Sequence, residues 1–503
     1  MALAPYYDRA AQAASQVIAG FDSDAFRERV TGSCVGVHVG PDATSAAAGR
    51  HLLDLTVRLL ARFYPAIRLS GLDDGPLAET RTLIEAINPR IESRDQANAT
   101  IVIGTPGSEL ADAGRLVFAG CSGFDALIST NHPQLIGEGA NPFGAGASAA
   151  LACSNVFRAL FMGDVADEEF VFSTLTGELA ASPVESDQVD LMHEITLIGI
   201  GAIGNAALWA LQRCAASGTL HLVDNERVEA SNLQRYVLAT PAHEDTPKVN
   251  LGEDDERLRV VRHNVTIEEY AANCDQAIAH AVVGLDSAEA RRRVQASLPK
   301  IVDNAWTQPG DLGVSRHGGF GTDAACVYCL YLPDQATLNE DQLVAKALNI
   351  EPRLMEVRHL LYTNDPLTRP FLEGVAAALD IEIDPLLPFD GKPLRTLYVE
   401  GLCGGAIIPL ETLGQPRQEM HVPLAHQSAL AGVLLAAAAI GRSIGREIPP
   451  TGTRVTRINV LRRLAGEVTQ PAAIGGHGVC ICEDDDYRIV FNAKWAAVED
   501  PAN

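Results

Sequence analysis

The chain has 503 residues, of which 47% are hydrophobic and 20% charged, a composition typical of a globular protein with two or more domains. Its formal net charge is −25 at pH 7, which argues against nucleic acid or an anionic membrane as a partner, because both attract basic surfaces. The first ten residues lack the basic and apolar regions of a signal peptide, and ten cysteines then indicate a reducing, cytoplasmic location. The apolar run 430–441 is too short to span a bilayer and predicts a buried helix.

The N-terminal third alternates between two hydrophobic periodicities, one typical of strands and one typical of helices. This alternation predicts an α/β domain. The region lacks the glycine-rich motif described next, so we interpret it as a degenerate copy of the domain that follows, joined to it by a polar linker at 177–194. The expected strands are 35–40, 66–71, 99–105 and 123–130, and the expected helices are 51–65 and 146–161.

The segment 195–248 carries the strongest motif. A strand pattern leads into Gly199-x-Gly201-x-x-Gly204, a helix is expected over 206–217, and a second strand ends at Asp224. Glycines at this spacing permit a tight turn and a close approach of backbone to phosphates, and an acid at the end of the second strand can accept hydrogen bonds from a ribose. The alternative is that the glycines serve only to pack a strand–helix–strand unit.

Polar and basic residues after Asp224 narrow the class of nucleotide site. Asn232, Arg235 and Lys248 follow, and the run 280–286 predicts a buried strand that ends in Asp286. A hydride-transfer site needs no further cations, whereas cleavage of ATP between the α- and β-phosphates does. A carboxylate at a strand end is placed to hold Mg²⁺. The alternative is that these residues are ordinary surface charges.

The ten cysteines divide into three groups. Cys326, Cys329, Cys480 and Cys482 form two close pairs that can complete a structural zinc site, although two unrelated buried pairs are the alternative. Cys403 precedes two glycines and is a candidate nucleophile, with a small buried cysteine as the alternative. The remaining five are expected in the core: Cys34, Cys121, Cys153, Cys214 and Cys274.

The strings GIGAIG and DNERVEASNLQRY, with Lys248 downstream, resemble the adenylation domain of ubiquitin-activating and ThiF/MoeB-type enzymes. The resemblance implies two Rossmann-like doubly wound α/β domains, a crossover region with the catalytic cysteine, and a zinc site made of four cysteines. Glu226 and Tyr236 depart from the family pattern, which usually has Asp and Gln there. The implied boundaries are 1–180 for an inactive adenylation domain, 191–330 for the active ATP-binding domain, 331–425 for the crossover region and 426–503 for the C-terminal completion.

The resemblance also implies a role for each motif residue. Asp224 would bind the ATP ribose, and Asp286 would bind Mg²⁺. The segment PYYDRAAQ resembles the family's N-terminal helix, which makes Arg9 a candidate arginine finger. The phosphates would be handled by Asn232, Arg235 and Lys248.

The expected function follows from these roles. The chain would use ATP to adenylate the C-terminal carboxylate of a ubiquitin-like protein, form a thioester on Cys403 and pass the acyl group to a conjugating enzyme. The two halves would form an internal pseudo-dimer, which is compatible with further homodimerisation. Three alternatives stay open: a sulfur-carrier or peptide adenylating enzyme that stops at the acyl-adenylate, an NAD-dependent dehydrogenase, and a non-catalytic subunit that binds modifier proteins.

Overall fold

A computed structural model defines the fold. The chain forms two compact units, Met1–Tyr331 with His421–Asn503, and Leu332–Met420. The described residues are 4, 6–18, 20–108, 110, 113–163, 166–182, 188–273, 277–308, 310–332, 340–379, 381–398, 422–444, 452–466, 468–474 and 480–499.

The N-terminal half of the larger unit contains a six-stranded sheet. β2, β1, β3 and β4 pair in parallel, and β5, which follows β4 after a tight turn, pairs antiparallel with both β4 and β6. β1 and β3 are buried along their whole length, as expected for parallel strands with near-continuous apolar sequences. In sheet order the strands are β2 (Ile67–Ser70), β1 (Val35–Val39), β3 (Ala99–Ile103), β4 (Arg115–Ser122), β5 (Asp125–Ser129) and β6 (Glu169–Ser173).

The C-terminal half contains a nine-stranded sheet. Six neighbouring strands of this sheet, β9-β8-β11-β12-β13-β14, repeat the pattern of the first sheet. They have the same left-to-right order relative to their order along the chain, and the same parallel and antiparallel pairings. In sheet order the strands are β10 (Leu258–His263), β9 (Ala215–Val223), β8 (Ile195–Ile198), β11 (His280–Val283), β12 (Ile301–Gln308), β13 (Asp311–His317), β14 (Thr453–Ile458) and β15 (Thr469–Ala472), and β7 (Gln188–Asp190) pairs with β9.

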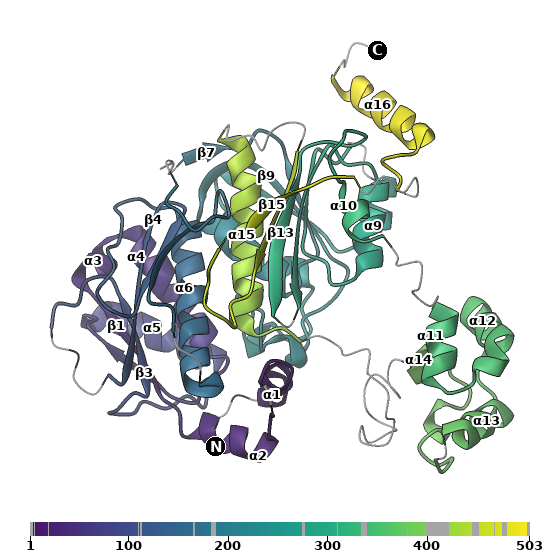
Figure 1. Ribbon diagram of the computed structural model, residues 1–503, viewed down its shortest axis with the longest axis horizontal. Helices are drawn as coiled ribbons and strands as arrows, with labels where there is room; N and C mark the ends of the chain where they lie inside the picture. Colours follow the sequence, from purple (N-terminus) through teal and green to yellow (C-terminus); the bar gives the residue numbers. More distant parts are fainter. Residues whose placement is uncertain are drawn as a thin grey trace. The chain divides into compact units, whose positions relative to one another are not determined.

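Corresponding helices pack together between the two sheets (Figure 1). The helix between the first two strands of each half is α4 (Ala47–Leu60) or α7 (Ala202–Arg213), and the helix before the last paired strand is α6 (Pro142–Phe157) or α15 (Ala425–Ser443). α4 packs on α6, α7 packs on α15, and α6 packs on α15 across the two halves. Two parallel-dominated α/β layers therefore share one hydrophobic core, which confirms the expected fold class.

Several element boundaries differ from the sequence prediction. The helix expected over 206–217 is α7, which begins at Ala202 and already ends at Arg213, because β9 begins at Ala215. The helix expected over 51–65 is α4, which ends at Leu60, and the strand expected over 280–286 is β11, which ends at Val283. The helical stretch Pro142–Met162 is long and apolar enough to cross a membrane by composition, but it is 89% buried inside the protein, as a core helix is.

The other α-helices of the larger unit lie before, within or after its two halves. α1 (Tyr7–Ser15) and α2 (Ser23–Thr31) precede the first sheet, and α3 (Pro41–Ser45) and α5 (Asp74–Ile87) lie within the first half. The second half adds α8 (Ile267–Asn273), α9 (Ala288–Ala296), α10 (Val327–Leu330) and α16 (Asp485–Glu499).

The smaller unit is helical and has its own apolar core. Val344, Leu372 and Val375 are among its most buried residues. Its helices are α11 (Glu340–Ala347), α12 (Leu354–Thr363), α13 (Arg369–Leu379) and α14 (Leu394–Thr396).

Candidate functional site

The glycine loop between β8 and α7 has the geometry of a phosphate cradle. Gly199 has φ +84°, and a Cβ there would lie 2.8 Å from Leu285, so a side chain is excluded. A Cβ on Gly204 would lie 1.9 Å from the carbonyl oxygen of Gly199, which lets α7 approach β8 closely. The nearest atom to a Cβ on Gly201 would be the Tyr236 hydroxyl oxygen, at 3.7 Å. The loop is therefore open at Gly201, where the first turn of α7 presents its backbone N–H groups.

Asp224 follows β9 and is fixed to the rim of this loop. Its carboxylate accepts hydrogen bonds from the backbone N–H of Ile200 at 2.7 Å and of Glu226 at 2.8 Å. Burial raises the pKa of Asp224, and the nearby Lys248 ammonium opposes that rise. Two oxygens offer about four acceptor positions, so the carboxylate keeps capacity for the hydroxyl groups of a ribose.

Lys248 lies in η4 (Lys248–Leu251) and is 5% exposed. Its ammonium donates to the Glu226 carboxylate and lies 5.4 Å from the centre of the Tyr236 ring. Burial lowers the pKa of Lys248, but Tyr236, Asp224 and Glu226 outweigh it and raise the pKa above its usual value. Lys248 therefore carries a fixed positive charge beside Asp224.

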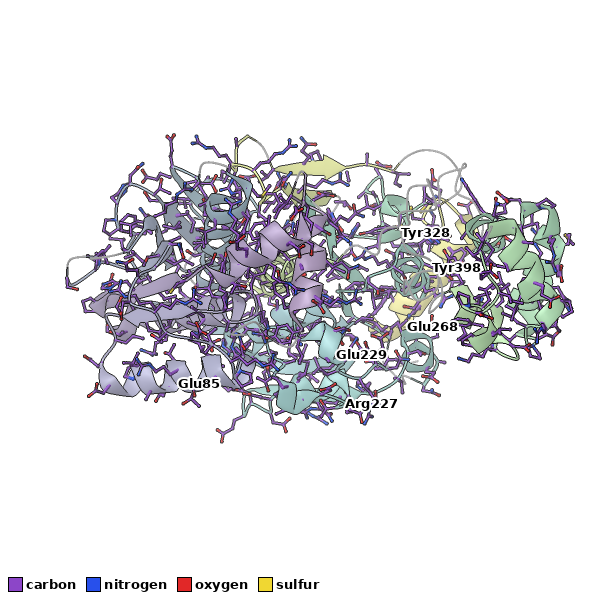
Figure 2. All side chains as sticks on the ribbon, turned by 90° about the horizontal axis from the view of Figure 1, so that it is seen from below. Glu85, Arg227, Glu229, Glu268, Tyr328 and Tyr398 are labelled. Atoms are coloured by element: carbon purple, nitrogen blue, oxygen red, sulfur yellow. The ribbon has the colours of Figure 1, made fainter. Side chains whose placement is uncertain are left out.

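Arg235 and Asn232 come from the segment that begins with η2 (Ala230–Asn232). The Arg235 guanidinium lies 5.8 Å from the centre of the Tyr236 ring, so this ring contacts both Arg235 and Lys248. Tyr236, whose role the sequence left in doubt, thus presents its π-system to two cations. The Asn232 side-chain oxygen accepts from the backbone N–H of Glu229 at 3.0 Å and caps the turn. Glu229 and the neighbouring Arg227 lie at the surface of this part (Figure 2).

The charges of Arg9 and Asp286, which are distant in sequence, both affect the pKa of the Arg235 guanidinium. Burial lowers the pKa of Arg235, Tyr236 and Asp286 raise it, and the positive charge of Arg9 lowers it. Arg9 lies in α1 and donates to the Gln12 side chain at 2.7 Å. Asp286 is exposed and lies beyond the end of β11, not within a strand as predicted. The fold therefore brings Arg9, Arg235 and Asp286 into one electrostatic neighbourhood.

Two arginines that lie outside the sequence motifs support this site from the other half. Arg62 is 1% exposed and donates to the backbone carbonyls of Tyr236, Val237 and Ala239. Arg58, at the end of α4, donates to the carbonyl of Val237 at 2.9 Å. Neither residue lies in a motif, so their role depends on contacts that a linear pattern does not reveal.

The turn after β1 is the counterpart of the glycine loop in the first half, and it is filled. The Asp42 carboxylate accepts from the backbone N–H of Ala43 at 3.0 Å and of Thr105 at 2.9 Å. A Cβ on Gly40 would lie 2.2 Å from the carbonyl oxygen of Thr105. The protein's own carboxylate thus occupies the donors that would bind a phosphate, which disfavours a second nucleotide at this turn.

Four cysteines gather into one cluster, as the sequence predicted. Cys326 precedes α10 and Cys329 lies within it, while Cys480 and Cys482 precede α16. Their sulfur atoms lie 3.2 to 3.8 Å apart in the pairs that are in contact, close to the edge of about 3.8 Å that Zn–S bonds of about 2.3 Å give a tetrahedron. The donor set fits a closed structural zinc site with no open position.

The cysteines of the described core are poor nucleophiles. Cys34, Cys121, Cys153 and Cys214 are buried, and burial raises the pKa of Cys121 to about 12. Burial also raises the pKa of Cys34 and Cys153. Cys403 and Cys274 lie outside the described residues. A thiol held far above its usual pKa has almost no thiolate at neutral pH, so the described core cysteines are structural.

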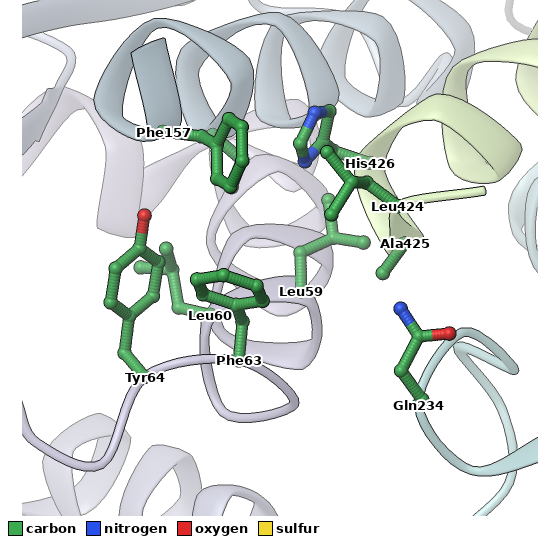
Figure 3. A pocket seen from close by; sticks show the side chains of 10 residues that line it. Leu59, Leu60, Phe63, Tyr64, Phe157, Gln234, Leu424, Ala425 and His426 are labelled. Atoms are coloured by element: carbon green, nitrogen blue, oxygen red, sulfur yellow. The ribbon is translucent and has the colours of Figure 1, made fainter. Parts of the chain in front are cut away.

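A small apolar pocket adjoins Gln234, in the segment that also carries Asn232 and Arg235 (Figure 3). Gln234, between Asn232 and Arg235, reaches toward Leu424 and Ala425 at the start of α15. Its side-chain oxygen is buried and has no hydrogen-bond partner among the described residues. The other side of the pocket comes from α4, α6, the turn after α4 and α15: Leu59, Leu60, Phe63, Tyr64, Cys153, Phe157 and His426.

Family models match both halves of the larger unit. Residues 182–296 match the ThiF family, and residues 39–162 match Prokaryotic E2 family C. The full chain is 38% identical to "Uncharacterized protein y4jF" of Sinorhizobium fredii (strain NBRC 101917 / NGR234), with 100% of this chain and 99% of that protein covered.

Solved structures of E. coli MccB are also similar to parts of the chain. The complex of MccB with MccA-N7isoASN matches with 14% identity and a TM-score of 0.33, over 58% of this chain and 67% of MccB. The complex of MccB with ATP matches with 13% identity and a TM-score of 0.33, over 58% of this chain and 66% of MccB. The chain thus spans about two thirds of the length of MccB. Residues 182–296 thus form a domain of the ThiF family, and over its whole length the chain belongs to the family of the Sinorhizobium protein y4jF.

Proposed function

We propose that this protein uses ATP to adenylate the C-terminal carboxylate of a ubiquitin-like protein and then carries the acyl group as a thioester on Cys403. The observation that supports the first step is that Lys248 and Arg235 both lie over the ring of Tyr236, whose hydroxyl adjoins Gly201, and that the charge of Arg9 acts on Arg235. A dehydrogenase would leave these three cations without a task. The ThiF family match over 182–296 includes the glycine loop, Arg235 and Lys248.

In the first step a carboxylate oxygen of the modifier attacks the α-phosphorus of ATP. A new O–P bond forms, the bond from the α-phosphorus to the bridging oxygen breaks, and pyrophosphate leaves. Backbone N–H groups at the start of α7 and the cations Arg235 and Lys248 would stabilise the negative charge that develops on the phosphates. The Asp224 carboxylate would orient the ribose, and Arg9 would add a guanidinium to the phosphates.

Two metals fit the donor groups that the fold presents. Asp286 offers an exposed carboxylate next to Arg235, which suits Mg²⁺ bound to phosphates. Bound Mg²⁺ would supply charge neutralisation. The cluster of Cys326, Cys329, Cys480 and Cys482 would hold Zn²⁺ as a structural ion and pin the segment before α16 to the core.

In the second step the Cys403 thiolate attacks the carbonyl carbon of the acyl-adenylate. A C–S bond forms, the C–O bond to AMP breaks, and AMP leaves with the electron pair. Four of the ten cysteines form the metal cluster, and four more are buried. Cys403 and Cys274 are the two that remain, and Cys403 lies in the glycine-containing sequence expected of a crossover loop.

A conjugating enzyme is the proposed acceptor of the acyl group. The match of residues 39–162 to Prokaryotic E2 family C supports a place in a conjugation pathway. Cys121 and Cys153, the cysteines within that range, are buried and have raised pKa values. The first half is therefore proposed to act as the inactive partner of a pseudo-dimer, with the acceptor thiol on a separate protein.

The test combines purified protein, ATP, Mg²⁺ and a candidate ubiquitin-like protein without reductant, and detects adducts on a non-reducing gel. Wild type and Cys274→Ala should form an adduct that a thiol reagent cleaves, and Cys403→Ala should form none. An adduct that persists in Cys403→Ala contradicts the thioester step. Pyrophosphate release without any adduct favours the alternative enzyme that stops at the acyl-adenylate.

A further inference from the structure

Arg62 makes an unusual set of contacts for a buried cation. It lies in the turn after α4, in the half whose own turn is filled by Asp42. Its Nη2 lies 2.6 Å from the carbonyl oxygen of Tyr236, 3.1 Å from that of Val237 and 2.6 Å from that of Ala239. These carbonyls belong to residues 232–239, which we call the motif loop because it also carries Asn232 and Arg235. One guanidinium from the first half thus holds the backbone of a loop in the second half.

The same face of α4 also holds the helix that follows the glycines. The Arg58 Nε lies 3.0 Å from both carboxylate oxygens of Asp54, and its Nη1 donates to Val237. Asp54 accepts a hydrogen bond at 2.7 Å from the indole N–H of Trp209, which lies in α7. Residues 54–62 therefore contact two parts of the proposed nucleotide site. Arg58 and Arg62 contact the motif loop, and Asp54 contacts α7, the helix that follows the glycine loop.

The buried charge of Arg62 explains why the motif loop would be held in one position. Burial lowers the pKa of Arg62 to about 10, so the guanidinium stays charged at neutral pH. Its hydrogen bonds among the described residues go to backbone carbonyls, and its Nε has no partner there. A buried charge that loses its hydrogen bonds is costly. Movement of the motif loop would remove three of these acceptors, so the charge and the loop hold each other in place.

We propose that Arg62 is a positioning residue that sets the motif loop so that Asn232 and Arg235 reach the phosphates of a bound nucleotide. The inference rests on the proposed nucleotide site, and it assigns a task to the half that has no open phosphate cradle of its own. Arg62 acts through backbone and does not touch the nucleotide. Its loss should therefore weaken phosphate recognition, while the ribose contact through Asp224 on the opposite wall stays intact.

The test measures the affinity of the full chain for ATP and for AMP, both with Mg²⁺, by calorimetry. The variants are Arg62→Lys, which keeps the charge, and Arg62→Met, which keeps the length. Arg158→Lys is the matched control, because Arg158 is also fully buried in the first half but donates to the Asn155 and Asp167 side chains, the latter at 2.6 Å. Circular dichroism melting reports how much each variant destabilises the fold.

Arg62→Lys should weaken ATP binding about tenfold or more, the loss expected when one or two charged hydrogen bonds are displaced. AMP binding should change by no more than about twofold, and Arg158→Lys should leave the ratio of the two affinities unchanged even if its melting temperature falls. Arg62→Met should show a larger loss of ATP affinity than Arg62→Lys. If Arg62→Met does not fold, the result for Arg62→Lys alone tests the inference. An unchanged ratio in folded Arg62→Lys, or an equal change in Arg158→Lys, overturns the inference alone. A wild-type chain that binds neither nucleotide overturns the proposed nucleotide site and this inference with it.

Discussion

Lys248 donates a hydrogen bond to Glu226, so the two residues form an ion pair at the edge of the nucleotide site. The Lys248 side chain is 6% exposed and that of Glu226 is 67% exposed, so the pair connects a buried cation to the surface. Glu226 stands where the family pattern has Asp, and its longer side chain reaches the ammonium. The pair fixes the direction of Lys248, which is the preorganisation that the proposed charge stabilisation would require.

The ion pair leads to a prediction for Lys248→Ala. We expect ATP-dependent adenylation to fall by about 10² to 10³, the usual cost of removing one preorganised donor from a transition state. The measurement is modifier-dependent release of pyrophosphate. Arg227→Ala is the control, because Arg227 directly follows Glu226 in the chain but pairs with Asp245 at the surface. Equal rates for Lys248→Ala and wild type would remove Lys248 from the proposed mechanism.

The four-cysteine cluster predicts one zinc ion per chain. Elemental analysis of protein purified without chelator should show it, and Cys482→Ser should lose it. Cys214→Ser is the control, since Cys214 is buried away from the cluster. We expect the zinc-free protein to melt at a lower temperature, because metal binding contributes directly to folding at such sites. Full zinc content in Cys482→Ser would argue against a four-thiolate site.

Buried histidines predict a loss of stability in mild acid. Burial lowers the pKa of His317 to about 4 and that of His426 to about 3. A folded-state pKa below the unfolded value of about 6.5 means that unfolding takes up a proton below pH 6.5. Each residue therefore contributes stability that is complete above pH 6.5 and declines as the pH falls, by up to about 1.4 kcal/mol per pH unit, until the folded-state pKa is reached.

Urea unfolding between pH 7.5 and 5 measures this decline. His426→Leu should show a shallower pH dependence than wild type, by about one proton per molecule. His132→Gln should match wild type, because His132 is about half exposed and lies on the surface near Glu169. A slope for His426→Leu equal to that of wild type would show that His426 is not held neutral in the folded protein.

Local sequence determined much of this molecule. The spacing of Gly199, Gly201 and Gly204 predicts the turn because each glycine answers a short-range steric demand. Asp224 follows the next strand and contacts the glycine loop, as its spacing predicted, whereas the roles of Asp224 and Lys248 toward ATP come from the family resemblance and stay predictions. The helix within 430–441 was evident from its continuous apolar composition, which requires burial. The exact ends of elements such as α7 were missed because a periodic pattern does not fix where the first hydrogen bond forms.

The tertiary structure decided what lies beyond the reach of local pattern. It places Arg9 near Arg235, gathers the two cysteine pairs into one cluster, and closes Arg62 over the carbonyls of the motif loop. Each of these joins segments that are distant in sequence, and the contact of Arg62 with the motif loop also joins the two halves, whose helices α6 and α15 pack together. Sequence spacing encodes conformations of a few residues, because those follow from local sterics and hydrogen bonding. Side chains from separate halves meet only when burial of the shared apolar core brings the halves together.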